Sequence, residues 1–190
     1  MDRFGIKIAG ASGGGILSTG EIIIKAFKDL GFYVVAEREY PSVIKGGHAC
    51  FNINISTGPI HSLRQKVDAM LAIDLESLQF YFDCLKDGGV LVHGLERAIG
   101  IKAISEKAAG RDVKIVNLPA RTVAVASGGN VLITNMVLIG MLWKALGLEY
   151  KQIAEQVSER FKNKPKLLES DLKCLKAGYD GAEKAVDLEL

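Results

Sequence analysis

The sequence predicts an α/β fold with a mostly parallel, mixed central sheet flanked by helices, followed by a helical C-terminal part. Up to about residue 116, short apolar runs typical of buried strands alternate with amphipathic helical segments. This alternation indicates right-handed crossovers that join parallel strands. From about residue 120 onward, the apolar residues follow helical spacing. With 190 residues, 48% of them hydrophobic, the chain can build a real core, and we expect residues 1–190 to form a single domain.

Local patterns place the individual elements. Strands are expected over residues 4–9, 32–37, 50–55, 68–73, 90–92 and 113–116, and helices over residues 14–30, 75–85, 100–109, 130–146, 150–161 and 166–180. The first helix should end at Gly31, because glycine readily adopts the left-handed conformation that closes a helix. Residues 60–63 are expected to pair with the third strand in an antiparallel hairpin, which makes the sheet mixed. Gly88 and Gly89 are expected to stop the second helix.

Composition and charge exclude several classes of protein. The chain has 24 Lys and Arg residues against 22 Asp and Glu, so its net charge of +2 gives no electrostatic reason to expect nucleic acid as a partner. The longest apolar stretch, residues 131–143, is too short to span a bilayer. Charged residues at Asp2, Arg3 and Lys7 interrupt the N-terminus before a secretory signal could form. We therefore expect a cytoplasmic protein that binds neither nucleic acid nor membrane.

The sequence assigns no metal ligand and no catalytic residue to this chain. The three cysteines are far apart and include no CxxC pair, which argues against an iron–sulfur cluster, a zinc site and a disulfide framework. The three histidines are equally scattered. These residues are Cys50, Cys84, Cys174, His48, His61 and His93. Asp74 follows an expected strand, where a carboxylate can be catalytic, but its place before Leu75 favours a helix cap.

A Gly-rich turn is the first candidate binding element. Residues 8–20 read IAGASGGGILSTG, and they join an apolar, strand-like run to a helical one. Such a turn lets backbone N–H groups converge at the positive end of a helix, where they can hold an anion such as a phosphate. Gly13, Gly14 and Gly15 are the candidate donors. The alternative is a tight strand-to-helix turn that binds nothing.

A second glycine-containing loop is the other candidate element. Residues 39–48 read EYPSVIKGGH, and they place the positive charge of Lys45 beside the flexible pair Gly46 and Gly47. Because the loop also contains aromatic and apolar residues, we expect it to contact a ligand or a partner subunit. The alternative is a surface loop with Lys45 in water. If both loops face the same crevice at the carboxyl ends of the strands, they form a seat for an anionic group.

The strand, Gly-rich turn and helix also have a Rossmann-like order, so a stand-alone NAD-binding protein is the alternative function. The dinucleotide fingerprint G-x-G-x-x-G requires an acidic residue at the end of the second strand. Gly10 and Gly15 fit the fingerprint, but Ser12 stands at its middle glycine. Glu37 is a passable partner for the ribose by its position.

One expected helix is apolar nearly all round. Residues 129–140 read GNVLITNMVLIG, and a helix without a polar face is buried on all sides. It is either a central core helix or one that another subunit completes. Asn135 within it needs a hydrogen-bond partner. From the size of this apolar surface we expect the isolated chain to associate as a homodimer.

These motifs together resemble the gamma subunit, or gamma domain, of the 2-oxoacid:ferredoxin (acceptor) oxidoreductases, over nearly the whole chain. Residues 39–48 are most similar to the E-Y-P-S-x-I-R-G-G-H loop of the 2-oxoglutarate-type branch, and residues 129–140 to the pattern G-N-x-x-x-x-N-M-x-x-x-G. Three positions depart from the family. Gly14 stands where glutamine is usual, Asp171 where asparagine is usual, and Lys45 where arginine is usual, which removes bidentate recognition of phosphate.

The resemblance implies a role inside a complex that oxidatively decarboxylates a 2-oxoacid, leaves an acyl-CoA and passes electrons to ferredoxin. Thiamine diphosphate with magnesium would be bound by the alpha and beta subunits, and iron–sulfur clusters by a ferredoxin-like subunit. This chain would bind none of these cofactors alone, would supply no catalytic residue, and would support assembly. A contact with CoA is implied for the two glycine loops, that is for Gly13, Gly14, Gly15, Lys45, Gly46 and Gly47.

Overall fold

The computed structural model describes residues 3–39, 47–62, 64–96, 101–130 and 133–188. The strands are β1 (Arg3–Ala11), β2 (Tyr33–Glu39), β3 (His48–Ser56), β4 (Val67–Ala72), β5 (Leu85–His93) and β6 (Lys114–Asn117). The helices are α1 (Ile16–Asp29), α2 (Leu75–Tyr81), α3 (Ile101–Ala109), α4 (Ala120–Ala126), α5 (Thr134–Ala145), α6 (Tyr150–Phe161) and α7 (Pro165–Gly181). The predicted α/β class with a helical C-terminal part is confirmed.

The six strands form one mixed sheet in the order β2-β3-β1-β4-β5-β6. β1, β4, β5 and β6 are parallel neighbours, whereas β3 runs antiparallel to both β1 and β2. The predicted hairpin between β3 and residues 60–63 is wrong, because residues 60–62 form no strand and residue 63 lies outside the described part. β3 already has a partner on each edge, so no edge remains for a returning strand.

Gly88 and Gly89 do not stop a helix, contrary to the prediction. α2 ends at Tyr81, a short 3-10 turn (Phe82–Cys84) follows, and the glycine pair lies inside β5. Gly88 has a φ of +72°, and the pairing of β4 with β5 shifts its register beside this point. A Cβ on Gly89 would lie 3.0 Å from the backbone oxygen of Asp68. The glycines therefore accommodate an irregularity in the strand, as is common at bulges.

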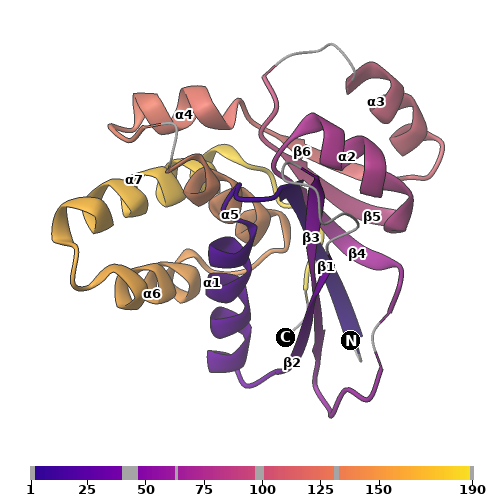
Figure 1. Ribbon diagram of the computed structural model, residues 1–190, viewed down its shortest axis with the longest axis horizontal. Coiled ribbons are helices and arrows are strands. Elements are labelled where there is room, and N and C mark those ends of the chain that lie inside the picture. The colour runs from indigo at the N-terminus through magenta and orange to yellow at the C-terminus, as the bar shows by residue number, and fades with distance from the viewer. Residues whose placement is uncertain (1–2, 40–46, 63, 97–100, 131–132, 189–190) are drawn as a thin grey trace.

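Helices cover both faces of the sheet, as Figure 1 shows. α1, α5, α6 and α7 lie on one side, where Ile6 and Ile8 of β1 join the larger core cluster. α2 and α3 lie on the other side, where Leu78 of α2 packs with Met70 of β4 in a second cluster. α1 ends as predicted before Gly31, which has a φ of +89°. Successive side chains of a strand point to opposite faces of the sheet, so each inner strand contributes side chains to both core clusters.

α5 is the central core helix, as its apolar sequence predicted. Its backbone approaches that of α7 so closely that a Cβ on Gly140 would overlap the carbonyl oxygen of Leu175, and one on Gly178 that of Val137. Trp143 is fully buried and its ring lies 5.0 Å from that of Phe27 in α1. This chain's own helices thus cover α5. The reason from which we expected a homodimer is therefore wrong, although dimerisation itself is untested.

Within the described ranges, no helix combines the length and the hydrophobicity needed to cross a membrane.

Candidate functional site

The candidate site lies where the chain leaves two neighbouring parallel strands in opposite directions. After β1 the chain enters α1, which packs on the larger core, and after β4 it enters α2, which packs on the other face of the sheet. Figure 1 shows α1 and α2 on opposite sides of the strands. In open α/β sheets, such a switch point at the carboxyl ends of the strands leaves a crevice where ligands bind. The predicted Gly-rich turn lies at this point.

The Gly-rich turn presents backbone without side chains. The N–H of Gly14 donates to the carbonyl oxygen of Ala11 at 2.9 Å, which closes the turn. Gly13 and Gly15 have φ values of +92° and +80°, a region that residues with a side chain rarely adopt. Gly15 is the N-cap residue of α1 and contributes no capping side chain. A side chain on Gly13 would meet nothing within 4 Å among the described atoms.

The second glycine loop reaches the same turn. The N–H of Ser12 donates to the carbonyl oxygen of Gly47 at 3.1 Å, and His48 pairs with Ala11 in the sheet. Gly47 therefore lies beside the Gly-rich turn, as the hypothesis of a shared crevice requires. Lys45 and Gly46 lie outside the described residues.

Asn135 finds its partner in the turn. Its Nδ2 atom donates to the carbonyl oxygen of Gly14 at 2.9 Å. A Cβ on Gly15 would lie only 2.5 Å from the same nitrogen. The sequence showed that Asn135 needs a partner, but not which one, because the two residues are 121 positions apart. The first turn of α5 thus fixes the turn that precedes α1.

Asp74 caps α2, as predicted. Its Oδ1 atom accepts the N–H of Ser77 at 2.7 Å, and its Oδ2 atom accepts the N–H of Ala11 at 2.6 Å. Both oxygens are therefore engaged with backbone donors, one at the start of α2 and one at the end of β1. This use favours the structural role of Asp74 over a catalytic one.

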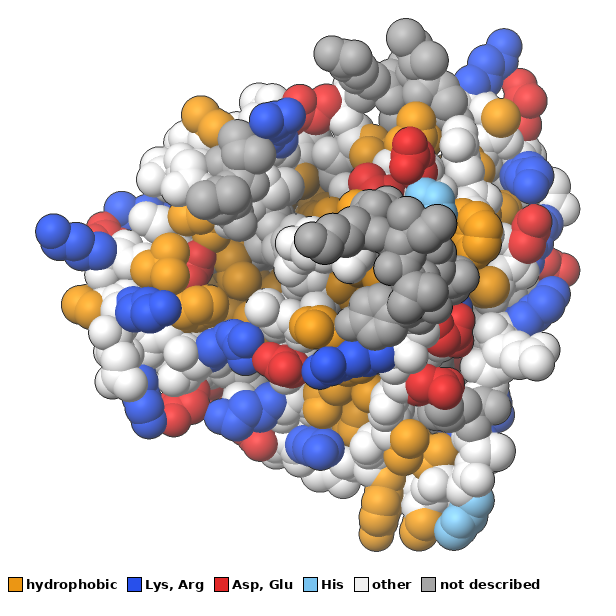
Figure 2. All heavy atoms as spheres, in the orientation of Figure 1, with side chains coloured by type: hydrophobic (Ala, Val, Ile, Leu, Met, Phe, Trp, Pro, Cys, Tyr) orange, Lys and Arg blue, Asp and Glu red, His pale blue; other side chains and the backbone are white. Residues whose placement is uncertain are grey.

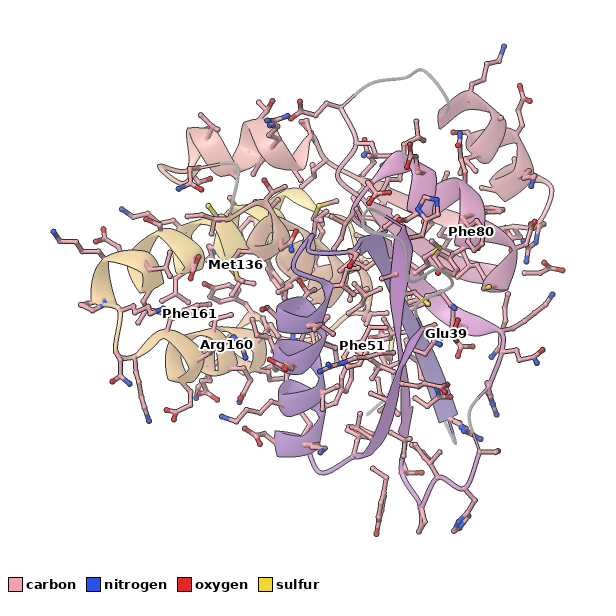
Figure 3. The ribbon with its side chains drawn as sticks, in the orientation of Figure 1. Glu39, Phe51, Phe80, Met136, Arg160 and Phe161 are labelled. Atoms are coloured by element: carbon pink, nitrogen blue, oxygen red, sulfur yellow. The ribbon has the colours of Figure 1, made fainter. Side chains whose placement is uncertain are left out.

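An aromatic pair borders the site on the α2 side. The His48 ring stacks on that of Phe80 with 5.3 Å between their centroids, and its Nδ1 atom lies 3.5 Å from Ser77 Oγ. Phe80 is 59% exposed, and Figure 3 shows it on the α2 side of the strands, away from Met136 of α5. Phe80 was not predicted from the sequence to border the site. An aromatic residue on the polar face of an amphipathic helix was the available signal.

His93 is a structural residue at the end of β5. It is 1% exposed, and its Nδ1 atom lies 2.8 Å from Asn117 Nδ2, which makes this ring nitrogen the acceptor. Burial lowers the pKa of His93 to about 4. The imidazole is therefore neutral at physiological pH and carries its proton on the other ring nitrogen, so it is poorly suited to acid–base catalysis near pH 7.

A buried polar cluster lies on the α2 side of β1 and β3. Lys7 is 3% exposed, and its Nζ atom lies 3.4 Å from Cys50 Sγ and 3.8 Å from Glu39 Oε2. Burial raises the pKa of Cys50 to about 11, and burial also raises the pKa of Tyr81. Cys50 is therefore a protonated, unreactive thiol.

Glu37 does not occupy the position that a dinucleotide requires. It pairs with Asn52 of β3, and β3 separates β2 from β1. Two strand spacings put β2 about 10 Å from β1, whereas a dinucleotide-binding fold has its second strand directly beside the first. The geometry thus gives no support to the NAD-binding alternative.

The described residues contain no group of three or more His, Cys, Asp or Glu side chains that could hold a metal ion. Figure 2 shows basic and acidic side chains intermixed over the visible face. The charge of this face is therefore mixed rather than concentrated in a patch of one sign. The described part of the site can bind an anion through backbone donors, and it contains no assembled pair of a nucleophile and a base.

Comparison with known proteins identifies relatives. A sequence model for the family "Pyruvate ferredoxin/flavodoxin oxidoreductase" matches residues 5–181. The 2-oxoglutarate synthase subunit KorC of Methanothermobacter thermautotrophicus is 31% identical over 153 residues, which are 80% of each chain. Subunit alpha of 2-oxoacid:ferredoxin oxidoreductase 2 from Aeropyrum pernix is 39% identical over 93 residues, 49% of this chain and 14% of that relative.

The chain therefore spans only a small part of some relatives and most of others. Among solved structures, the 2-oxoglutarate:ferredoxin oxidoreductase of Magnetococcus marinus, with 2-oxoglutarate, coenzyme A and succinyl-CoA bound, shares the fold with a TM-score of 0.81. The match covers 98% of this chain and 33% of that one at 22% identity. At this identity the likeness establishes the fold.

Proposed function

The chain belongs to the pyruvate ferredoxin/flavodoxin oxidoreductase family, where it corresponds to the gamma type of subunit or domain, and we propose that it serves in a complex that oxidatively decarboxylates a 2-oxoacid to an acyl-CoA. Its partners are alpha, beta and ferredoxin-like subunits, with ferredoxin as the indirect electron acceptor. The complex works in the cytoplasm.

In this proposal the carbon and redox chemistry belongs to the partner subunits. Thiamine diphosphate with magnesium supplies the carbanion chemistry there, and iron–sulfur clusters accept the electrons. Three cysteines cannot supply the four thiolates that ferredoxin-type clusters use, and two of the three are buried in different cores. This chain contributes assembly surface and a binding element rather than a reacting group. That the isolated chain forms a homodimer stays a prediction, since α5, the helix that suggested it, is covered within the chain.

We further propose that the two glycine loops receive an anionic group of CoA. The observation that carries this proposal is the start of α1: its N-cap residue is a glycine with no capping side chain, and Gly47 of the second loop lies against the turn. Helix N-termini bind phosphates through free N–H groups and the helix dipole. Gly13, Gly14 and Gly15 supply the backbone donors, and the loop of Lys45, Gly46 and Gly47 supplies the positive charge.

The test is the Lys45→Ala substitution in the reconstituted complex. The apparent KM for CoA should rise roughly ten- to hundredfold, the range for losing one hydrogen bond to a charged group. Reduction of the complex by 2-oxoacid before CoA is added should be unchanged, because that half-reaction does not use the loop. Lys25→Ala, on the exposed side of α1, removes the same charge and should leave the KM unchanged.

A Lys45→Ala complex with normal CoA kinetics but weaker subunit association would make the loop an assembly element and overturn the CoA assignment. Turnover of 2-oxoacid by the pure isolated chain, with thiamine diphosphate, CoA and an artificial acceptor, would overturn the subunit role. Sedimentation of the isolated chain tests dimerisation, and a strict monomer at about 50 μM would contradict it.

A further inference from the structure

Asn135 touches the Gly-rich turn at two consecutive residues. Its Nδ2 atom donates to the Gly14 carbonyl oxygen at 2.9 Å, and the space beside Gly15 is filled by the same nitrogen. The side chain belongs to the first turn of α5, a helix held rigidly between α1 and α7. The contact therefore anchors a glycine-rich segment to the most deeply buried helix of the molecule.

This hydrogen bond fixes the orientation of one peptide unit. In a trans peptide, the carbonyl oxygen and the following N–H point in opposite directions. Because Asn135 holds the Gly14 oxygen toward α5, the N–H of Gly15 must point away from α5. A peptide between two glycines otherwise turns over at low cost, since glycine populates positive and negative φ about equally. The anchor thus selects one of two accessible orientations.

We infer that Asn135 is a positioning residue, which orients the Gly14–Gly15 peptide so that the Gly15 N–H faces the ligand. Among the described residues, no side chain caps that end of α1. The identity of the ligand as CoA rests on the proposed function, whereas the orientation of the peptide does not. In this role Asn135 acts through the backbone that it holds.

The test uses Asn135→Asp in the reconstituted complex. This change keeps the size of the side chain but replaces the donor with an oxygen, which repels the Gly14 carbonyl and favours the turned-over peptide. We expect the KM for CoA to rise roughly ten- to hundredfold, as for a lost charge-assisted hydrogen bond. The kcat at saturating CoA should stay within about twofold, because the interaction concerns binding rather than the reacting bonds.

Asn117→Asp is the matched control. Asn117 Nδ2 also donates to a backbone carbonyl, that of His93, at 2.9 Å and at the same edge of the sheet. The Asn117→Asp substitution makes the same change of charge at a residue that does not contact the Gly-rich turn. Its KM for CoA should stay within about twofold of wild type. Asn135→Ala removes the donor without adding charge, so its KM should rise in the same direction by a smaller factor. Equal KM values for the Asn135 variants and Asn117→Asp, in a complex whose KM does rise with Lys45→Ala, would overturn the positioning role.

The amide of Gly15 separates this inference from the proposed function. In the 15N-labelled chain, Asn135→Asp should shift the Gly15 amide resonance and change its hydrogen-exchange rate, while Asn117→Asp should not. Suppose that the Gly15 amide changes but the KM is unchanged in every variant, Lys45→Ala included. This result would overturn the CoA assignment and would support the orientation of the Gly14–Gly15 peptide by Asn135. An unchanged Gly15 amide in both Asn135 variants would overturn the inference itself.

Discussion

The two helices that start at the switch point begin in opposite ways. α2 begins at Asp74, whose carboxylate accepts backbone N–H groups from both Ser77 and Ala11. α1 begins at Gly15, which has no side chain to offer, and the residues before it are also glycines. Helix N-termini carry unpaired donors that something must satisfy. Asp74 closes the start of α2, whereas no described side chain caps the start of α1, where we propose that an external anion binds.

The two helix starts are also held in place by different side chains. The side chain of Asp74 links the start of α2 to the end of β1. Among the described residues no side chain caps the start of α1, and the amide of Asn135 holds the preceding peptide through the Gly14 oxygen. The start of α2 is thus closed by a side chain, whereas the start of α1 presents backbone. Three substitutions, two of them with a comparison variant, test this contrast, from the largest expected effect to the smallest.

Gly15→Val should have the largest effect on stability. The substitution places a branched side chain at a φ of +80° and against Asn135 Nδ2, so it combines backbone strain with a clash. We expect a loss of about 2–4 kcal/mol in the free energy of unfolding, measured by urea denaturation. Gly13→Ala is the control, because its φ is +92° but the space is open, and it should cost only about 1 kcal/mol. Equal losses would mean that Asn135 does not fill the site beside Gly15.

Asp74→Ala should destabilise the chain by about 1–3 kcal/mol in the same assay, because it removes an N-cap and leaves the Ala11 N–H without its acceptor. Asp74→Asn retains acceptor oxygen and should cost less. Asp74→Ala should not change the KM for CoA of the reconstituted complex by more than about twofold. A large rise in KM without loss of stability would place Asp74 in the ligand site and break the contrast.

Asp171→Asn tests the helical layer behind the α1 start. Asp171 lies in α7 and is 2% exposed, and burial raises its pKa from 3.8 to about 6. The folded state thus binds a proton at the Asp171 carboxyl group more tightly than the unfolded state does. The contribution of Asp171 to stability is fully present below about pH 4 and is lost as the pH rises to about 6. Asp171→Asn should be more stable than wild type by about 1–2 kcal/mol at pH 7 and similar to it near pH 4.

Urea denaturation at both pH values checks this expectation. A gain of the same size at pH 4 and pH 7 would show that the ionisation of Asp171 is not its cause. Because Asp171 lies in the supporting layer, the substitution should leave the affinity for CoA unchanged.

Much of the fold followed from the sequence because its signals are local. Apolar runs gave β1, β4 and the core helix α5, and Gly31 and Asp74 marked a helix end and a helix start. The pairing of β3 could not be predicted, since strand partners are chosen between segments far apart in the chain. For the same reason the hairpin at residues 60–63 was a wrong prediction. Gly88 and Gly89 were misread because glycine pairs serve helix ends and strand bulges alike.

The candidate site was predictable in part. The Gly-rich turn has a recognisable spacing, and the contact of Gly47 with that turn agrees with the hypothesis that both loops share a crevice. The partnership of Asn135 with Gly14 and the stack of Phe80 on His48 join residues from distant segments. No single-sequence pattern contains those distances, so the three-dimensional fold was needed to reveal them.

A titration of the 15N-labelled chain with CoA tests the contrast between the two helix starts most directly. The account predicts that CoA shifts the amide resonances of Gly13, Gly15 and Ile16, at the start of α1. It predicts no shift for the amides of Ser77 and Leu78 at the start of α2, because Asp74 already occupies that end. Shifts at the start of α2, or none at either helix start at about 1 mM CoA, a concentration that detects weak binding, would contradict it.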